Sequence, residues 1–314
     1  MSIFGKPEVI ILKETSDSKT YLSQLEELQK EITPGTELAK KLDKEIAITK
    51  AGIIGEDASL FELKNSGMDL VVLHDIYIET NDGRGAQIDY VVITPYARVF
   101  IECKNLFGDI EINSKGDFIR TIFYGGRKIR EGIYSPITQN QRHMAVFKDI
   151  QLSEHGIVGK ASINLYFNEY NRSLVVLANP KTVVNDRYAP KDVKEQVIRC
   201  DQLIAKLKSI KGSDKSSKKD MLDSGERMLA KNIDSQKEYI QKFLELKKLA
   251  VKETREKTST VSEQLQGIVS EREPLVCPWC GKDLVLRTAK KGTNVGKQFY
   301  GCSGFPKCRY VKNV

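Results

Sequence analysis

The sequence contains no apolar run that approaches the roughly 20 residues a helix needs to span a bilayer. Residues 1–12 hold a short apolar run but lack the small-residue cleavage site of a secretion signal. We therefore expect a cytoplasmic protein that does not associate with membranes. At 314 residues, with 40% hydrophobic and 29% charged residues, the chain is long enough for two globular domains.

Cysteine is scarce outside the C-terminal end, where four of the six cysteines lie in a C-x2-C-x21-C-x5-C pattern. In a chain without a secretion signal, this spacing indicates a metal site rather than disulfides. Four thiolates complete a tetrahedral zinc site with no open position, so the zinc is expected to be structural. An iron–sulfur cluster would use the same ligands. The four residues are Cys277, Cys280, Cys302 and Cys308.

Acidic residues are almost absent from the same end: between Pro274 and Val314, eight Lys or Arg accompany the single acid Asp283. This excess would attract a polyanion, and nearby aromatic rings offer flat faces for stacked bases. The alternative is a basic tail whose aromatic residues, Phe305 and Tyr310 above all, fill the small core of the ribbon. The residues predicted to contact DNA are Trp279, Arg287, Lys290, Lys291, Lys297, Phe299, Tyr300, Lys307 and Arg309.

Hydrophobic patterning divides the chain into four segments. Residues 1–50 are predicted to form an N-terminal helical extension that opens on a short strand and ends with a helical stretch over 36–48, and a second helical stretch is expected over 52–65. Residues 51–205 alternate short strands with helices, which predicts an α/β domain. Residues 206–272, rich in Lys, Ser and acids, are typical of a connector with a helix over 221–257, whose apolar stripe either packs or recruits a partner. Residues 273–314 contain the four-cysteine ribbon.

Two carboxylates and a lysine are predicted to meet on neighbouring strands of the α/β segment. Asp89 begins one apolar run, and Glu102 and Lys104 lie on the next. If the loop 95–98 closes a hairpin, Asp89 lies opposite Lys104, with Glu102 two residues away on the same face. Burial of these charges among apolar neighbours costs free energy unless they serve a function or pair as a salt bridge.

Two carboxylates can hold a hard cation such as Mg²⁺ or Mn²⁺, here with the backbone carbonyl of Cys103. The cation would polarise a phosphodiester, and Lys104 would orient the attacking water or stabilise developing charge. Glu56 shares a helix face with apolar residues, so it either joins this cluster or lies at its rim. Gln139, near the start of a later helix, is a candidate ligand for water or phosphate, whereas His143 is expected to pack.

These residues, in this order, resemble the nuclease-related domain (NERD), a branch of the PD-(D/E)xK superfamily. The resemblance implies a restriction-endonuclease-like core, a mixed sheet flanked by helices, in a bacterial, Mg²⁺-dependent, DNA-processing nuclease. It implies a site made of Glu56, Asp89, Glu102, Lys104 and Gln139. Two residues depart from the family pattern without removing a ligand, Cys103 and Ser135. The matching stretches are 55–56, 87–92, 100–105, 108–110, 135–140 and 174–177.

The C-terminal stretch CPWCGKDLVLR…FYGCSGFPKCRY resembles the zinc ribbon of type IA DNA topoisomerases, including its G-C-S-x-[FY]-P-x-C ending. This resemblance implies binding of single-stranded DNA. The leading hypothesis is therefore a Mg²⁺-dependent deoxyribonuclease whose ribbon captures single-stranded or branched DNA. The alternatives are a catalytically idle DNA-binding protein and a regulator that binds RNA. In each case the connector offers a surface for a homo-oligomer or a protein partner.

Overall fold

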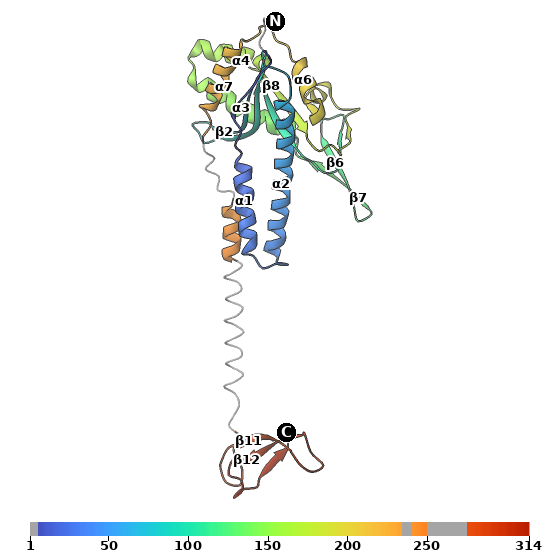
Figure 1. Ribbon diagram of the computed structural model, residues 1–314, viewed down its shortest axis with the longest axis vertical. Helices are drawn as coiled ribbons and strands as arrows, with labels where there is room; N and C mark the ends of the chain where they lie inside the picture. The colour runs from blue at the N-terminus through green and yellow to red at the C-terminus, as the bar shows by residue number, and fades with distance from the viewer. Residues whose placement is uncertain (1–5, 234–239, 250–274, 314) are drawn as a thin grey trace. The chain divides into compact units, whose positions relative to one another are not determined.

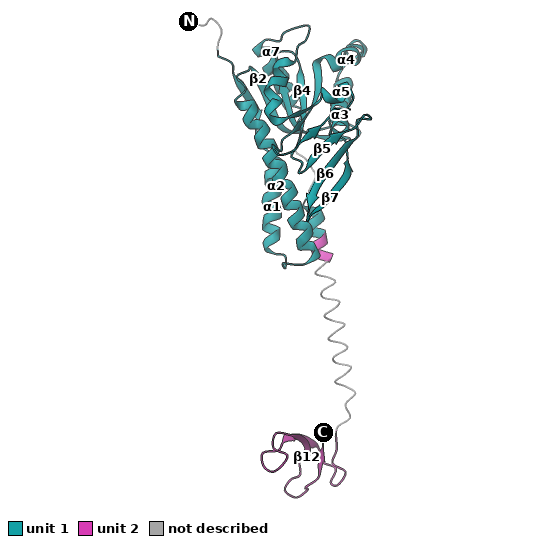
Figure 2. Ribbon diagram, turned by 90° about the vertical axis from the view of Figure 1, so that its right-hand side faces the viewer, with its two compact units in different colours: residues 1–245 teal, residues 246–314 magenta. Residues whose placement is uncertain are grey.

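The computed structural model describes residues 6–233, 240–249 and 275–313 of the chain. The chain forms two compact units, residues 1–245 and residues 246–314 (Figure 2). The first unit is an α/β structure in which helices cover a mixed sheet, which confirms the predicted fold class. Among the helices of the described ranges, none combines the length and apolarity that a bilayer span requires.

A six-stranded sheet forms the centre of the first unit, in the order β1-β2-β3-β4-β8-β10. The β2, β3 and β4 strands pair antiparallel, whereas β1, β8 and β10 join in parallel. Parallel neighbours need crossover connections, and helices provide these here. The strands are β1 (Val9–Lys13), β2 (Leu70–Glu79), β3 (Gly85–Ile93), β4 (Arg98–Lys104), β8 (Asn171–Leu177) and β10 (Val197–Arg199).

Helices bury both faces of this sheet (Figure 1). One face packs against α2 (Glu37–Lys64) and α6 (Leu203–Ser209). The other packs against α3 (Pro136–Glu154), α4 (Ile157–Tyr170) and α7 (Lys218–Leu229). Successive side chains of a strand point to opposite faces, so both sets of side chains in the central strands must be apolar. The central strands are therefore buried on both sides, and so are polar residues within them such as His74 and Glu102.

A second, four-stranded sheet adjoins the first, in the order β7-β6-β5-β9. Its buried face contributes Ile110, Ile112 and Phe118 to a core shared with Val175 and Ile137 of the central layers. The β6–β7 hairpin continues beyond this core. The strands are β5 (Asp109–Ile112), β6 (Phe118–Tyr124), β7 (Arg127–Ile133) and β9 (Val184–Asn185).

The long helix α2 begins at Thr36, whose side chain accepts a hydrogen bond from the Ala39 amide and so caps the first turn. The helical stretches expected over 36–48 and 52–65 are one continuous helix. The helix continues through its glycines. One of them, Gly55, lies where the helix packs closely against the residues that follow β4. A Cβ at this position would stand 2.8 Å from Cβ of Asn105.

Gly55→Ala is expected to destabilise the protein by about 1–3 kcal/mol, because the added methyl group overpacks this contact. Gly52→Ala on the same helix is the matched control. A Cβ there would have no neighbour within 4 Å, so its higher helix propensity should stabilise by up to about 1 kcal/mol. Urea unfolding of both variants measures the difference. Equal free energies of unfolding would contradict the close packing of α2 on Asn105.

The structure differs from the predicted domain boundaries at two segments, the N-terminal extension and the start of the connector. The predicted N-terminal extension is not separate, because β1 pairs with β2 at the edge of the central sheet. The predicted connector begins later than residue 206, because α6 and α7 bury apolar side chains against the sheet. Met221 and Met228, seven residues apart on one face of α7, are both buried. Of the helix expected over 221–257, residues 234–239 and 250–257 lie outside the described residues.

The second unit contains a three-stranded antiparallel sheet in the order β11-β12-β13. Its apolar interior is small: the buried residues of this unit include Cys277 and Cys302 but no large aliphatic side chain among residues 275–313. A segment of this size lacks the apolar area for an independent core, so its fold depends on another source of free energy. The strands are β11 (Leu284–Thr288), β12 (Gln298–Cys302) and β13 (Val311–Asn313).

Candidate active site and zinc ribbon

The β3–β4 hairpin sets the register of the candidate acidic site. Ile93 pairs with Arg98 and Tyr90 with Ile101, so the predicted register, which joined Thr94 to residue 99, is wrong by two residues. The cause is the turn: the Thr94 side chain accepts hydrogen bonds from the amides of residues 96 and 97, which tightens the loop. Continued by one residue, the observed register brings Asp89 opposite Glu102 rather than Lys104.

Glu102 is buried, with 1% of its surface exposed, although it carries a carboxylate. Its Oε1 atom lies 2.6 Å from Nζ of Lys104, the next side chain on the same face of β4. Its Oε2 atom accepts no hydrogen bond and lies 3.5 Å from Nδ1 of His143 on α3. Burial raises the pKa of Glu102, although Lys104 opposes the shift. Burial lowers the pKa of Lys104, but the charge and hydrogen bond of Glu102 outweigh this effect and raise it.

Asp89 lies where β3 and β4 separate. Its Oδ2 atom accepts a hydrogen bond of 2.7 Å from the backbone amide of Cys103, which extends the contact between the strands beyond their last paired residues. Burial, and then the charges of Glu102 and Glu56, hold the pKa of Asp89 well above its ordinary value. The three carboxylates are therefore close enough to repel one another, which a bound cation would relieve.

Glu56 reaches this region from α2 and is held by a histidine. Its Oε2 atom lies 2.9 Å from Nε2 of His74, a buried residue of β2. The His74 ring stacks on Tyr90 with centroids 4.4 Å apart, and the Tyr90 hydroxyl donates to the backbone oxygen of Glu56. These contacts fix both the helix and its carboxylate relative to the sheet.

The two other polar positions on α3 have different surroundings. Gln139 lies one turn before His143, and its side chain makes no hydrogen bond to the described residues. The neighbouring Asn140 is fully buried and donates to the Phe100 carbonyl (2.8 Å) and to Oγ of Ser173 (3.0 Å). Asn140 thereby anchors α3 on two adjacent strands. His143, expected to be a packing residue, faces the carboxylate of Glu102.

Sequence reasoning missed His74 and its neighbour Asp75. Asp75 has a positive φ of 57°, and its carboxylate accepts hydrogen bonds from the Asp17 amide and the Gln87 side chain. The signal was present, because these two polar residues interrupt an otherwise apolar strand. From the sequence alone, however, two polar residues in a strand could equally indicate a strand at the exposed edge of a sheet.

The donor set fits a hard divalent cation. Glu102 has a buried oxygen without a hydrogen-bond donor, and such an atom is destabilising unless another partner satisfies it. Burial is the main cause of the raised pKa values of Asp89 and Glu102, and the neighbouring carboxylates add to both shifts, so a bound cation would be favourable here. The carboxylates do not form a closed cluster: within the described ranges, only the four ribbon cysteines bring three or more ligand atoms within 4.8 Å of one another. A cation held here would therefore have few protein ligands at once and would keep most of its water shell, as Mg²⁺ commonly does.

Cys103, the residue between Glu102 and Lys104, points to the opposite face of the sheet. Its thiol donates a hydrogen bond of 3.3 Å to Oγ of Ser59 on α2, and burial raises the pKa of the thiol well above its ordinary value. The side chain therefore cannot serve as a thiolate ligand, and only its backbone carbonyl is available to the site.

Asp89→Asn is expected to raise the melting temperature in EDTA at pH 7–8. The pKa of Asp89 is higher in the folded than in the unfolded protein. Below the pKa of the unfolded protein the protonated carboxyl is fully compatible with the fold, and this stability is lost as pH rises towards the pKa of the folded protein. The neutral amide removes this loss, and the advantage should vanish near pH 4. Added Mg²⁺ should stabilise the parent protein by about 2.7 kcal/mol at a concentration 100 times its Kd, but not Asp89→Asn.

Differential scanning fluorimetry measures these shifts. Asp57→Asn, which changes a half-exposed carboxylate paired with Lys19, is the control and should keep the Mg²⁺ response of the parent. A Mg²⁺ shift of equal size in Asp89→Asn would show that the cation does not bind at this carboxylate.

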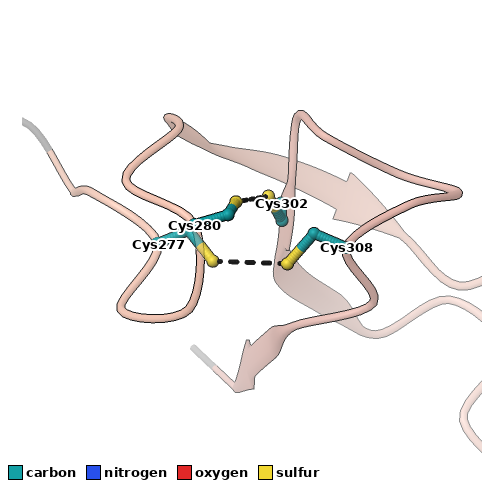
Figure 3. A group of neighbouring side chains, drawn as sticks. All are labelled: Cys277, Cys280, Cys302 and Cys308. Carbon is teal, nitrogen blue, oxygen red and sulfur yellow. Dashed lines mark hydrogen bonds between the residues drawn. The ribbon is translucent and has the colours of Figure 1, made fainter.

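The ribbon brings the four cysteines together from two loops (Figure 3). Sγ of Cys277 lies 3.7 Å from Sγ of Cys308, and Sγ of Cys280 lies 3.3 Å from Sγ of Cys302. Four sulfurs at ~2.3 Å from a tetrahedral zinc ion would be separated by about 3.8 Å. The arrangement is a zinc-ribbon site, and zinc held by these four cysteines would supply the folding free energy that the apolar interior lacks.

The DNA-contacting residues predicted in the ribbon lie on its surface. Trp279 has 71% of its surface exposed, and Lys290, Lys291 and Lys297 are exposed in the loop that joins β11 to β12. Arg287 pairs with Phe299 across the two strands. A groove of about 390 Å³ is lined by both of these residues together with Phe305, Arg309 and Tyr310.

Phe305 was expected to fill the ribbon core, but 59% of its surface is exposed. It lies in the short loop between Cys302 and Cys308, which the metal ligands hold without an apolar anchor. Tyr310 is half-buried and packs edge-on against Trp279, with ring centroids 5.2 Å apart. Tyr300 and Phe299 are also half-buried, whereas Lys307 and Arg309 are exposed.

Comparison with known proteins agrees with these two units. Residues 51–178 match the nuclease-related domain family, and residues 275–314 match the topoisomerase DNA binding C4 zinc finger family. Over 47 residues the chain is 47% identical to DNA topoisomerase 1 of Methanothermobacter thermautotrophicus, which covers 14% of this chain and 6% of that protein. No solved structure matches the chain significantly. The chain thus joins a nuclease-related domain of PD-(D/E)xK-like fold to a topoisomerase-type zinc ribbon, as the resemblances predicted.

Proposed function

We propose that this protein is a divalent-cation-dependent deoxyribonuclease that hydrolyses phosphodiester bonds at the site around Glu102. The buried Glu102 carboxylate carries this proposal, because one of its oxygens is paired with Lys104 and the other accepts no hydrogen bond. A purely structural salt bridge at this depth would have both oxygens hydrogen-bonded, whereas Oε2 has only the ion-pair contact with Nδ1 of His143 at 3.5 Å. The neighbouring carboxylates of Asp89 and Glu56 add charge that a structural role does not require.

Asp89, Glu102 and the backbone carbonyl of Cys103 would hold the cation. A bound Mg²⁺ or Mn²⁺ would polarise the phosphodiester and lower the pKa of a water molecule. Lys104 keeps its proton, because Glu102 raises its pKa, so it would donate to that water or to the phosphate oxygens where charge develops. Glu56, held by His74, would orient water around the cation. Gln139 is proposed as a further ligand of water or phosphate.

The ribbon would deliver DNA to this unit, with a preference for single strands. Its groove combines Arg287 and Arg309 with the rings of Phe299 and Phe305. Basic residues neutralise phosphates. Unpaired bases can stack on these aromatic rings, whereas the bases of a duplex are already stacked on one another and cannot. Such a protein would act in bacterial DNA processing or defence, as the sequence resemblance implies.

A cleavage assay tests the proposal. The full-length protein is incubated with end-labelled single-stranded and double-stranded DNA of one sequence, in Mg²⁺, in Mn²⁺ and in EDTA. Products that appear with either metal and not in EDTA, and that increase with protein concentration, are the expected result. RNA of the same sequence distinguishes a deoxyribonuclease from a regulator that binds RNA.

The second candidate function is a DNA-binding protein with an idle nuclease fold. It is favoured by one observation, that the carboxylates are not gathered into a compact ligand cluster among the described residues. Tight DNA binding without products in either metal would establish this alternative and overturn the nuclease proposal.

A further inference from the structure

The β6–β7 hairpin extends from the second sheet (Figure 1), and the residues on both strands of its tip are exposed. Phe123 has 66% and Tyr124 has 77% of its surface exposed. In the register, Tyr124 lies opposite Arg127 and Phe123 opposite Lys128. Directly opposed residues of antiparallel strands share a face, and successive residues alternate faces. Each face of the tip therefore presents one aromatic ring and one basic side chain.

The two basic residues of the tip differ from those nearer the root. Arg120 pairs with Glu131, and Arg130 lies 2.8 Å from Glu111, so the root neutralises its own charges. Arg127 and Lys128 form no ion pair with the described residues. Two unpaired cations beside two exposed rings are complementary to a ligand that combines negative charge with flat surfaces. A nucleic acid has both, in its phosphates and its bases.

The turn makes this tip narrow. Gly125 and Gly126 have φ values of 56° and 75°, the left-handed conformation that a two-residue hairpin turn of type I′ requires. Only two residues therefore separate Tyr124 from Arg127. A thin projection with one stacking ring on each face has the shape of a wedge, whereas a platform for a single strand would carry its rings on the same face.

The root of the hairpin is fixed close to the candidate active site. Thr121 pairs with Asp109, and a Cβ at the adjacent Gly108 would stand 2.4 Å from the Thr121 carbonyl oxygen, so the chain passes there without space for a side chain. Asp109 lies five residues after Lys104, and Tyr124 lies three residues after Thr121. At ~3.4 Å per extended residue the tip lies within roughly 30 Å of Lys104. This distance corresponds to about nine base pairs of duplex DNA.

We propose that the hairpin tip is a strand-separating wedge that inserts at a junction between duplex and single-stranded DNA. Tyr124 and Arg127 contact one of the two separated strands, and Phe123 and Lys128 contact the other. The rings replace the stacking that the terminal base pair loses at the junction. The inference refines the substrate of the proposed nuclease to forked DNA, and it rests on that proposed function for the cleavage of the bound fork. Binding itself does not depend on cleavage.

Binding is measured by fluorescence anisotropy without added Mg²⁺ or Mn²⁺ and without a chelator, so that the ribbon keeps its zinc. The full-length protein is titrated into a forked duplex, a blunt duplex and a single strand of matched length. A variant with both Phe123→Ala and Tyr124→Ala is expected to lose roughly tenfold or more in affinity for the fork, and little for the single strand. Tyr188→Ala removes another exposed ring beside an arginine, away from this hairpin, and should leave all three affinities unchanged.

A second variant keeps the rings and reverses the charge, with Arg127→Glu and Lys128→Glu, and should also lose affinity for the fork. A 2-aminopurine base at the junction should brighten on binding of the parent protein, since its stacking is disrupted, and not on binding of either variant. Equal losses on the fork and the blunt duplex, or unchanged affinity for the fork, would overturn the wedge. Binding is measured without the metal that cleavage needs, so the two proposals can fail separately. Fork preference in a protein that cleaves no DNA in Mg²⁺ or Mn²⁺ would refute the nuclease function alone.

Discussion

Glu102→Gln is expected to lower the initial rate of DNA cleavage by at least about 100-fold at saturating Mg²⁺. The amide has nearly the same shape but carries no charge, so it weakens the hold on the cation and ends the ion pair with Lys104. The protein should remain folded, because a neutral side chain suits this buried position better than a charged one. The rate is measured on end-labelled single-stranded DNA, with circular dichroism as the test of folding.

The chain supplies its own control for this prediction. Glu62 begins a second Glu-x-Lys triplet, on helix α2, where no strand context accompanies it. Glu62→Gln makes the same chemical change and should leave the rate within about twofold of the parent, an effect typical of surface substitutions. Cleavage by Glu102→Gln at the parent rate would remove Glu102 from the catalytic assignment. Lys104→Ala is expected to lose activity as well, but it also leaves a buried carboxylate unpaired.

Replacement of two zinc ligands, Cys302→Ser with Cys308→Ser, is expected to lower affinity for single-stranded DNA by about tenfold or more. The ribbon has too little apolar interior to hold its strands without the metal, so the groove between Arg287 and Phe305 would be lost with it. Titration of a labelled single strand at several salt concentrations measures the change. The salt dependence should also weaken, because fewer phosphates are neutralised.

Cys200→Ser is the matched control, because it removes a thiol that lies on the central unit beside Ser59 and belongs to no metal site in the described residues. It should retain both zinc content and DNA affinity. The deletion of residues 274–314 should reproduce the loss seen with the two ligand substitutions. Full affinity in either ribbon variant would show that DNA binds elsewhere on the chain.

Most of the α/β layout could be predicted because its strands have distinct signals. Runs of mostly apolar residues such as 70–78 and 99–105 predict strands, and β2 and β4 match them closely. The place of β1 and α7 could not be predicted. Their apolar residues require burial, but nothing in a local pattern specifies which distant surface provides it, and both join the central sheet through contacts far apart in sequence.

In the candidate site, too, features of the local sequence could be predicted and contacts between distant residues could not. Asp89, Glu102 and Lys104 stood out because charges interrupt apolar runs. Their relative register was predicted incorrectly, since it depends on the hydrogen bonds of Thr94 within the turn. The roles of His74 and His143 arise from contacts between a strand and a helix, which only the folded chain reveals.

The family match over residues 51–178 is shorter than the folded unit, and this has a practical consequence for protein production. A fragment cut at those limits would lose β1 and β10, exposing the backbone of β2 and β8 along two open edges. It would also lose α7, whose buried Met221 and Met228 shield one face from water. Such a fragment should aggregate on expression, and inactivity in it would say nothing about the catalytic competence of the intact protein.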